Sequence, residues 1–396
     1  MASIAARMAR LGTEAAFEVL ARARALEAQG RRVVHLEIGE PDFATAPHVT
    51  AAAKQALDEG FTHYGPSAGL LPAREAIARY VGRTRGLAVS PEQVVITPGA
   101  KPILFFSILA VVDEGDEVLV PDPGFPIYDS VVRYVGATPV SVPLLEARAF
   151  RFDPDELRRR VSPRTRLIIL NSPHNPTGGV LAPDDLCAVA DVARARDLWV
   201  LSDEIYSRLL YDGEHQSIAA LPGMAERTIL LDGFSKTYAM TGWRLGYGVA
   251  PEPLVPHLTR LQTNATSCTA SFVQMAGIAA LDGPQDGVEA MCAEFAQRRR
   301  ALVDGLNAID GVRCLPPGGA FYAFPRVEVE GHTSKQIADS LLNEEGVAVL
   351  AGTAFGAQGE GYLRLSFATS MDELHEGMAR IARGLDRLRR AVGSRQ

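Results

Sequence analysis

The chain has 396 residues, 47% of them hydrophobic and 22% charged, and its 47 acidic and 40 basic side chains give a formal net charge of −7. At roughly 150 residues per domain, this length predicts two or three domains with buried cores, and the composition excludes a disordered chain or a small disulfide scaffold. Because the negative net charge provides no overall positive field for nucleic acid or anionic lipid, we expect a small-molecule ligand.

We expect no membrane-spanning segment and no secretory signal peptide. The longest apolar run, about residues 103–112, is shorter than the roughly 20 residues that cross a bilayer. The first thirteen residues lack acidic side chains and carry Arg7 and Arg10, which weakly resembles a transit peptide, but no apolar signal-peptide core follows them. The cysteines form no C-x-x-C pair, which indicates free thiols in a reducing compartment; they are Cys187, Cys268, Cys292 and Cys314. We therefore expect a cytoplasmic protein of the bacterial type.

The first predicted elements are a helix over about residues 14–29 and a short strand over 33–38. Gly30 provides a stop for the helix, and the strand runs into a Gly-Glu-Pro-Asp turn at 39–42. No Pro/Gly/Ser-rich linker separates this part from the rest. We expect residues 1–45 to pack against a small C-terminal domain.

From residue 94 onward, short apolar runs alternate with segments of helical period. The expected strands are 94–97, 117–120, 166–170, 198–202, 228–231 and 245–249, and the expected helices include 100–112, 126–135 and 183–196. Strands that alternate with helices over short connections are typical of a mostly parallel sheet with helices on both faces. We assign this α/β domain to residues 46–284.

The character of the sequence changes after about residue 285. A long charged helix through 298–300 is followed by strands near 312–314 and 321–324 and by a closing helix over 371–389. This order predicts a second, smaller α+β domain at residues 285–396.

Polar residues follow the ends of successive predicted strands, which is the edge where open α/β sheets bind ligands. They are Asn175, then Asp203 and Tyr206, and then Ser235, Lys236 and Arg244. Any one of them would fit an ordinary solvated loop. Together they supply a nucleophilic amine, a carboxylate for a cationic ring nitrogen and a guanidinium for a phosphate.

The segments around these residues resemble the class I and II aminotransferases that depend on pyridoxal phosphate. They are Asn-Pro-Thr-Gly at 175–178, Ser-Asp-Glu-Ile-Tyr at 202–206, Ser-Lys-Thr at 235–237 and Gly-Trp-Arg-Leu-Gly at 242–246. Segments 39–43, 64–66, 319–322 and 364–366 extend the resemblance over nearly the whole chain. The chain is most similar to the bacterial branch of aspartate, aromatic and broad-range aminotransferases. The resemblance implies fold type I, with a mostly parallel seven-stranded sheet in the large domain, and a homodimer with its sites at the subunit interface.

The resemblance also implies a role for each residue around the cofactor ring. Lys236 forms a Schiff base with the cofactor aldehyde, and its freed amine carries the proton between Cα and C4′. Asp203 pairs with the protonated pyridine nitrogen and keeps the ring an electron acceptor. Asn175 and Tyr206 donate hydrogen bonds to the phenolic oxygen, and Phe125 stacks on the ring.

The phosphate and the substrate carboxylate have their own implied partners. The start of the helix at 100–112 provides backbone N–H donors from Ala100 and Lys101. The other phosphate partners implied are Ser235, Arg244 and, from the partner subunit, Tyr64. Arg364 matches the arginine that binds the substrate α-carboxylate bidentately, with Gly39 and Asn175 as further substrate contacts.

Other functions fit less of the sequence. The apolar strand that ends in Asp203-Glu204 resembles that of nucleotide hydrolases, but no G-x-x-x-x-G-K-[ST] motif is present, and Gly-Tyr-Gly at 246–248 is only a fragment of a dinucleotide motif. The eight histidines show no metal-ligand spacing, so we expect no metal. A pyridoxal phosphate-binding regulatory protein, and an amino-acid oxidase or lyase on the same fold, stay open as alternatives.

The donor amino acid is predicted from the N-terminal segment. Dicarboxylate-specific relatives usually place an extra basic side chain there, whereas residues 11–17 are small, apolar or acidic and Arg10 is the nearest cation. We expect a broad range of neutral, aromatic or aspartate-like L-amino acids as donors, with 2-oxoglutarate or pyruvate as the acceptor. Recognition of a basic substrate by Glu14 is the alternative.

Overall fold

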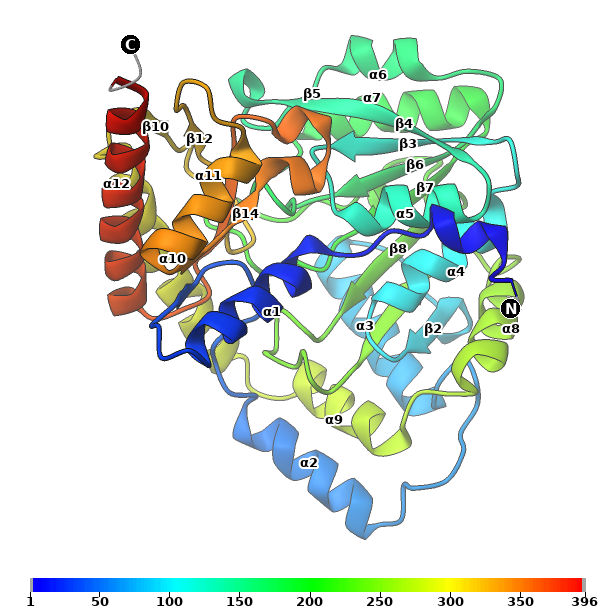
Figure 1. Cartoon of the computed structure of the whole chain (residues 1–396). Helices are drawn as coiled ribbons and strands as arrows, with labels where there is room; N and C mark the ends of the chain where they lie inside the picture. The colour runs from blue at the N-terminus through cyan, green and yellow to red at the C-terminus, as the bar shows by residue number, and fades with distance from the viewer. Residues whose placement is uncertain (1–2, 394–396) are drawn as a thin grey trace.

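The computed structural model describes residues 3–393. A central sheet is covered by helices on both faces, and the C-terminal helices α10 (Asp286–Asn307), α11 (Ser334–Ser340) and α12 (Met371–Gly393) gather at one end of it (Figure 1). The α/β class predicted from the alternating strands and helices is confirmed.

The large sheet has eight strands rather than seven. Its spatial order is β2 (Val94–Thr97), β9 (Gly246–Val249), β8 (Thr228–Gly233), β7 (Trp199–Asp203), β6 (Thr165–Asn171), β3 (Glu117–Asp122), β4 (Thr138–Leu145) and β5 (Arg151–Phe152). Only β9 and β5 run against the others. The added strand is the two-residue β5: the chain reverses through a turn at Glu146–Arg148 and left-handed backbone at Ala149 and Phe150, and then pairs with the end of β4.

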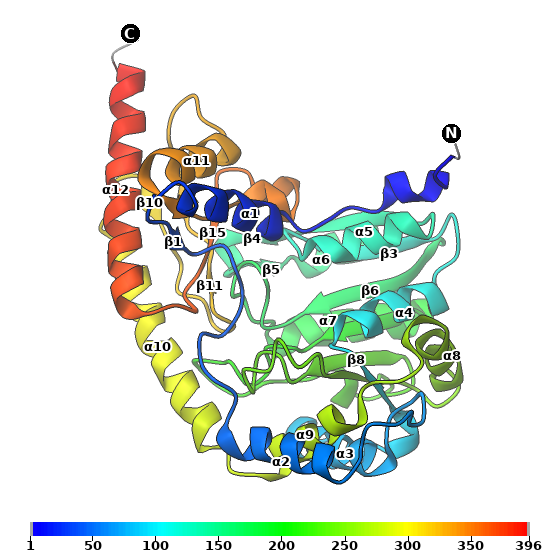
Figure 2. The same cartoon turned by 60° about the horizontal axis from the view of Figure 1, so that its bottom comes forward.

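Successive side chains of a strand point to opposite faces of the sheet, so the hydrophobic core has a part on each face. In β2, Val95 packs with α4, α5 and α8, whereas Val94 and Ile96 pack with α2, α3 and α9. Figure 2 shows α2, α3 and α9 together at one end of the molecule, and α6 and α7 cover the strands of the other end on the same face. The bounds are α2 (Pro47–Asp58), α3 (Leu71–Arg85), α4 (Lys101–Val111), α5 (Pro126–Tyr134), α6 (Pro154–Arg160), α7 (Pro183–Arg196), α8 (Val255–Thr266) and α9 (Ser271–Asp282).

The N-terminal segment joins the C-terminal elements. Its strand β1 (Val34–His35) pairs in parallel with β13 (Val347–Ala348), and Val34 and Leu36 are buried with side chains of α10 and α12. The remaining elements are α1 (Ala15–Glu27), the pair β10 (Val312–Arg313) and β12 (Arg326–Val327), and the sheet of β11 (Tyr322–Ala323), β15 (Leu363–Ser366) and β14 (Leu350–Ala351). The division at residues 45 and 284 stays a prediction, and residues 1–2 and 394–396 lie outside the described residues.

In the part of the chain that the structure describes, no helix combines the length and the apolar character needed to span a membrane. Within the same residues, no group of three or more His, Cys, Asp or Glu side chains is placed to hold a metal ion.

Candidate active site

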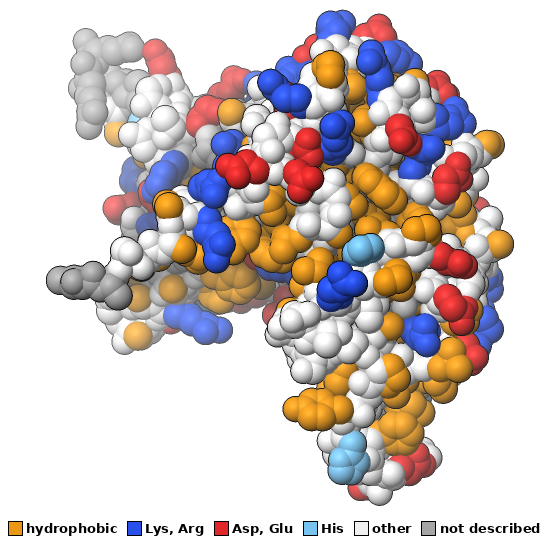
Figure 3. Space-filling model, turned by 90° about the vertical axis from the view of Figure 1, so that its right-hand side faces the viewer, with side chains coloured by type: hydrophobic (Ala, Val, Ile, Leu, Met, Phe, Trp, Pro, Cys, Tyr) orange, Lys and Arg blue, Asp and Glu red, His pale blue; other side chains and the backbone are white. Residues whose placement is uncertain are grey.

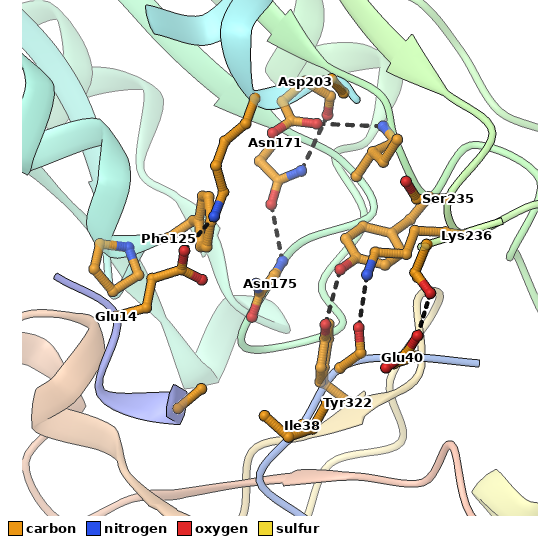
Figure 4. Close-up of a pocket in the computed structure, with 18 of the residues that line it drawn as sticks. Glu14, Ile38, Glu40, Phe125, Asn171, Asn175, Asp203, Ser235, Lys236 and Tyr322 are labelled. Atoms are coloured by element: carbon orange, nitrogen blue, oxygen red, sulfur yellow. Dashed lines mark hydrogen bonds and ion pairs between the residues drawn. The ribbon is translucent and has the colours of Figure 1, made fainter. Parts of the chain in front are cut away.

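A cavity of about 540 Å³ opens at the carboxyl ends of β6, β7 and β8, the edge that the sequence predicts (Figure 4). Its walls come from three distant parts of the chain: residues 14–40, residues 100–244 and residues 322–364. An open cavity of this size, lined by apolar groups and a few convergent charges, fits a small polar ligand.

Lys236 is the amine in this cavity. It comes three residues after β8, and its Nζ donates a hydrogen bond of 2.6 Å to the backbone oxygen of Gly39. Burial lowers the pKa of Lys236 to about 8, with Glu40 acting in the opposite direction and the cation of Arg364 in the same direction. About a tenth of the amine is therefore neutral, and nucleophilic, at pH 7.

Asp203 is the last residue of β7, and its carboxylate is buried. Tyr128 Oη, from α5, donates a hydrogen bond of 2.6 Å to Asp203 Oδ2, and the backbone N–H of Ile205 donates one of 3.3 Å to Oδ1. Burial raises the pKa of Asp203 to about 6, although the Tyr128 hydroxyl lowers it. The carboxylate is thus charged at neutral pH and would gain from a cationic ring nitrogen, which would replace the solvation that it has lost.

Asn175 and Tyr206 both line the cavity and are held by hydrogen bonds. The backbone N–H of Asn175 donates to Asn171 Oδ1 at 2.9 Å, while the Asn171 side-chain amide donates to the backbone oxygen of Asp203 at 3.0 Å. The hydroxyls of Tyr206 and Tyr322 lie 2.8 Å apart. These contacts hold the backbone of Asn175 and the hydroxyl of Tyr206 in place in the wall of the cavity.

Arg364, in β15, is a buried cation with an unused donor. Its guanidinium carbon lies 4.6 Å from the ring centroid of Tyr322 and 5.1 Å from that of Phe355. One nitrogen donates to the backbone oxygen of Glu37 and another to Asn175 Oδ1 at 3.5 Å, but Nε has no partner. A buried guanidinium without a carboxylate partner favours an anionic ligand such as a carboxylate.

A second anion-binding end lies at the start of α4. Ala100 and Lys101 carry the first of the free backbone N–H groups at the N-terminus of this helix. The Arg244 guanidinium lies so close to Gly99 that a Cβ at this position would overlap it. Gly99 also has a left-handed φ of 82°, which favours glycine. The helix N-terminus together with a guanidinium forms a site for a phosphate.

Eleven of the twelve residues named from the sequence line this one cavity: Gly39, Ala100, Lys101, Phe125, Asn175, Asp203, Tyr206, Ser235, Lys236, Arg244 and Arg364. Tyr64 does not line it, and its side chain is 90% exposed. Arg10 does not line it either, whereas Glu14 does and forms an ion pair with Lys101.

Several lining residues escaped the sequence analysis. Tyr128 gave no local signal, because its role depends on Asp203, 75 residues away. Tyr322 belongs to the Gly-Ala-Phe-Tyr segment at 319–322, so the resemblance carries a signal for this residue. Phe355 and Leu350 add an apolar wall that only the tertiary fold brings to the cavity.

The fold and this cavity define an α/β enzyme with a reactive amine and two anion-binding ends. Residues 31–381 match the family described as "Aminotransferase class I and II". The chain belongs to this family, and it is an aminotransferase, as the motifs predict. Enzymes of the family use pyridoxal phosphate, act on amino acids and oxo acids, and are typically homodimers.

Relatives with different names are similar over nearly their whole length. The chain is 43% identical to an aromatic-amino-acid aminotransferase of Thermococcus litoralis over 89% of this chain and 92% of the relative. It is 39% identical to an arginine–pyruvate transaminase of Pseudomonas aeruginosa over 93% and 94%. The solved structure of Thermus thermophilus aspartate aminotransferase with maleate has a TM-score of 0.93 at 38% identity, over 97% of this chain and all of that one (100%).

Proposed function

We propose that this chain binds pyridoxal phosphate through Lys236 and uses it to transfer the amino group of an L-amino acid to a 2-oxo acid. The observation that carries the proposal is the placement of the Lys236 amine, the Asp203 carboxylate and the Arg364 guanidinium in one cavity. A cavity with these three groups offers an amine for an aldehyde, an anion for a ring nitrogen and a cation for a carboxylate.

The residues present fit the cofactor. The helix start at Ala100 and Lys101, with Ser235 and Arg244, would hold the phosphate, because these groups supply N–H donors and positive charge in a space kept open at Gly99. Asp203 would hold the ring nitrogen and Phe125 a ring face, while Asn175 and Tyr206 would hold the phenolic oxygen. When bound, pyridoxal phosphate supplies an aldehyde that takes up an amino group and a ring that accepts electrons.

The protein's own groups account for binding and proton transfer. Arg364 binds the α-carboxylate of the substrate through its guanidinium, and the apolar walls exclude water from this contact. The lowered pKa of Lys236 lets its amine accept a proton from the substrate Cα and release it again near neutral pH. Asp203 stays anionic at neutral pH and so stabilises positive charge at the ring nitrogen.

The apolar part of the cavity lining supports the prediction of a broad, neutral or aromatic donor. Ile38, Leu350 and Phe355 line the cavity, and the Lys101 ammonium, also in its lining, is paired with the Glu14 carboxylate. Lys101 Nζ lies 5.5 Å from the ring centroid of Phe125. An apolar wall next to a paired charge favours uncharged side chains over dicarboxylates, while 2-oxoglutarate or pyruvate is proposed as the acceptor.

We also propose a homodimer in which Tyr64 of one subunit contacts the phosphate end of the other. The support is that Tyr64 is almost fully exposed and outside its own subunit's cavity. Apolar side chains gather broadly across the face shown in Figure 3, and exposed apolar patches of this kind mark association surfaces. The cytoplasmic location expected from the sequence stays a prediction.

An absorption spectrum recorded during additions of L-amino acids, with dissolved oxygen monitored, tests the proposal. We expect the band of the aldehyde form to give way to that of the amine form without oxygen uptake, and to return when a 2-oxo acid is added. Lys236→Ala should abolish turnover, while Lys54→Ala, an exposed lysine in α2, should leave it unchanged. Oxygen uptake would instead indicate an oxidase, and an absent cofactor band after reconstitution would refute the proposal.

A further inference from the structure

Next to Asp203, three charged side chains that do not line the cavity are buried together between α3, β7 and β8. Arg85 ends α3, and only 1% of its side chain is exposed. Its Nε donates a hydrogen bond of 3.0 Å to Glu204 Oε2, and its Nη2 donates one to Asp232 Oδ2. Glu204 follows Asp203 directly after β7, and Asp232 lies in β8, four residues before Lys236. One guanidinium therefore connects the ends of the two strands that carry Asp203 and Lys236.

Both carboxylates in this cluster have a full set of partners. Glu204 also accepts hydrogen bonds from Ser217 Oγ at 2.6 Å and Ser202 Oγ at 3.1 Å, and His215 Nε2 lies 2.8 Å from its Oε2. Asp232 accepts from the backbone N–H of Gly233 at 2.7 Å and from Tyr247 Oη at 3.2 Å. Removing the cation from a buried cluster of this kind leaves its carboxylates with uncompensated negative charge.

The two carboxylates act on Asp203 through their charge. Burial makes the largest contribution to the raised pKa of Asp203, and both Asp232 and Glu204 raise it further. Burial also opposes ionisation of Glu204, but His215 and Arg85 lower its pKa to about 2, so its negative charge persists next to Asp203. The titratable groups that face Asp203 or these neighbours are Tyr128, Tyr206, Glu204, Asp232, His215, Arg85, Tyr80 and Tyr247.

We propose that Arg85 is a positioning residue for the cofactor: by pairing with Glu204 and Asp232 at once, it offsets the two negative charges that flank Asp203 and keeps Asp203 anionic for a ring nitrogen. This inference rests on the proposed function. Without Arg85, two uncompensated carboxylates would favour the protonated, neutral form of Asp203, which no longer attracts a cationic ring.

The test measures the dissociation constant of pyridoxal phosphate from pH 5 to pH 9, by fluorescence titration of cofactor-free enzyme. Arg85→Met removes the charge and keeps most of the apolar stem. Arg83→Met, which replaces an exposed arginine two residues earlier in α3, is the matched control. Asp232→Asn removes one of the two carboxylates and leaves Arg85 paired with Glu204. His215 is present in every variant, so its own titration is common to all curves.

We expect Arg85→Met to move the acid-side loss of affinity up by about one pH unit, because a neighbouring charge changes a buried pKa by about this amount. Its affinity would then be about fivefold weaker than wild type at pH 6 and unchanged at pH 9. In Asp232→Asn the loss of affinity at acid pH should occur at a lower pH than in the wild type. Arg83→Met should show the same pH dependence of affinity as the wild type.

A change in affinity that is equal at every pH, or a loss of thermal stability with an unaltered affinity curve, would refute the role of Arg85. If Arg85→Met does not fold, the Asp232→Asn variant provides the test. Its loss of affinity for pyridoxal phosphate at acid pH must occur at a lower pH than in the wild type. The same pH dependence in both proteins would refute the inference. Failure of the wild type to bind pyridoxal phosphate would refute the proposed function instead. Wild-type binding and transamination with no shift in either variant would refute only the inference about Arg85.

Discussion

The lowered pKa of Lys236 predicts how fast cofactor-free enzyme takes up pyridoxal phosphate at different pH values. Only the neutral amine attacks an aldehyde. With a pKa of about 8, about 10% of Lys236 is neutral at pH 7, whereas an ordinary lysine with a pKa of about 10.4 is only about 0.04% neutral. Burial, which removes water from the ammonium form, therefore increases the reactive fraction about 200-fold at this pH.

The assay is stopped-flow absorption after mixing cofactor-free enzyme with pyridoxal phosphate between pH 6 and pH 10. Because the pKa is lowered, the rate should rise about tenfold per pH unit only up to about pH 7.5 and level off above pH 8. The same reaction with Nα-acetyl-lysine in the same buffers corrects for the ionisations of the cofactor itself.

Glu40→Gln provides an internal check. The Glu40 carboxylate stabilises the charged form of Lys236, so its removal should lower the pKa and move the level region to lower pH. A wild-type rate that continues to rise tenfold per unit through pH 10 would show that Lys236 titrates as an ordinary lysine. The reasoning from burial would then be wrong.

Two substitutions test how the cavity binds its substrate, and a third tests how closely its wall is packed. Glu14→Gln frees Lys101 from its ion pair and should increase kcat/KM for aspartate and glutamate about fivefold relative to phenylalanine, as expected for a partly exposed pair worth about 1 kcal/mol; equal changes for all donors would exclude this role. Arg364→Lys should raise KM for amino and oxo acids about a hundredfold, because an ammonium cannot replace the bidentate guanidinium, and an unchanged KM would remove Arg364 from carboxylate binding. Gly39→Ala should lower stability by about 1–3 kcal/mol in thermal unfolding, since a Cβ there would overlap the Tyr322 hydroxyl. A variant as stable as wild type would show that Tyr322 can move aside.

The sheet was largely predictable because buried parallel strands appear as short apolar runs. The strand predicted at 94–97 agrees with β2 at both ends, and the strand predicted at 198–202 differs from β7 by one residue at each end. In contrast, β4 was not predicted, since Pro139 and Pro143 interrupt its apolar pattern. These prolines are tolerated in a strand near the edge of the sheet, where fewer backbone N–H groups need partners.

The site residues that follow strands were accessible from the sequence, and their partners were not. A residue that follows a parallel strand must lie at the carboxyl edge of the sheet. Asn175, Asp203 and Lys236 therefore line the same cavity, independently of how their side chains are packed. The contact from Tyr128 to Asp203 and the cluster around Arg85 depend on which helix residue faces which strand end. That information lies in the packing of helices on the sheet, which periodicity alone leaves undetermined.

The hydrogen bond from Lys236 to Gly39 and the pairing of β1 with β13 bear on how the chain matures during synthesis. The N-terminal strand is made first, but its partner is more than 300 residues away, so Val34 and Leu36 stay uncovered until translation is nearly complete. Arg364 emerges later still. The large sheet can form on the ribosome well before the cavity closes, and a prematurely terminated chain would expose an apolar segment that chaperones and proteases recognise.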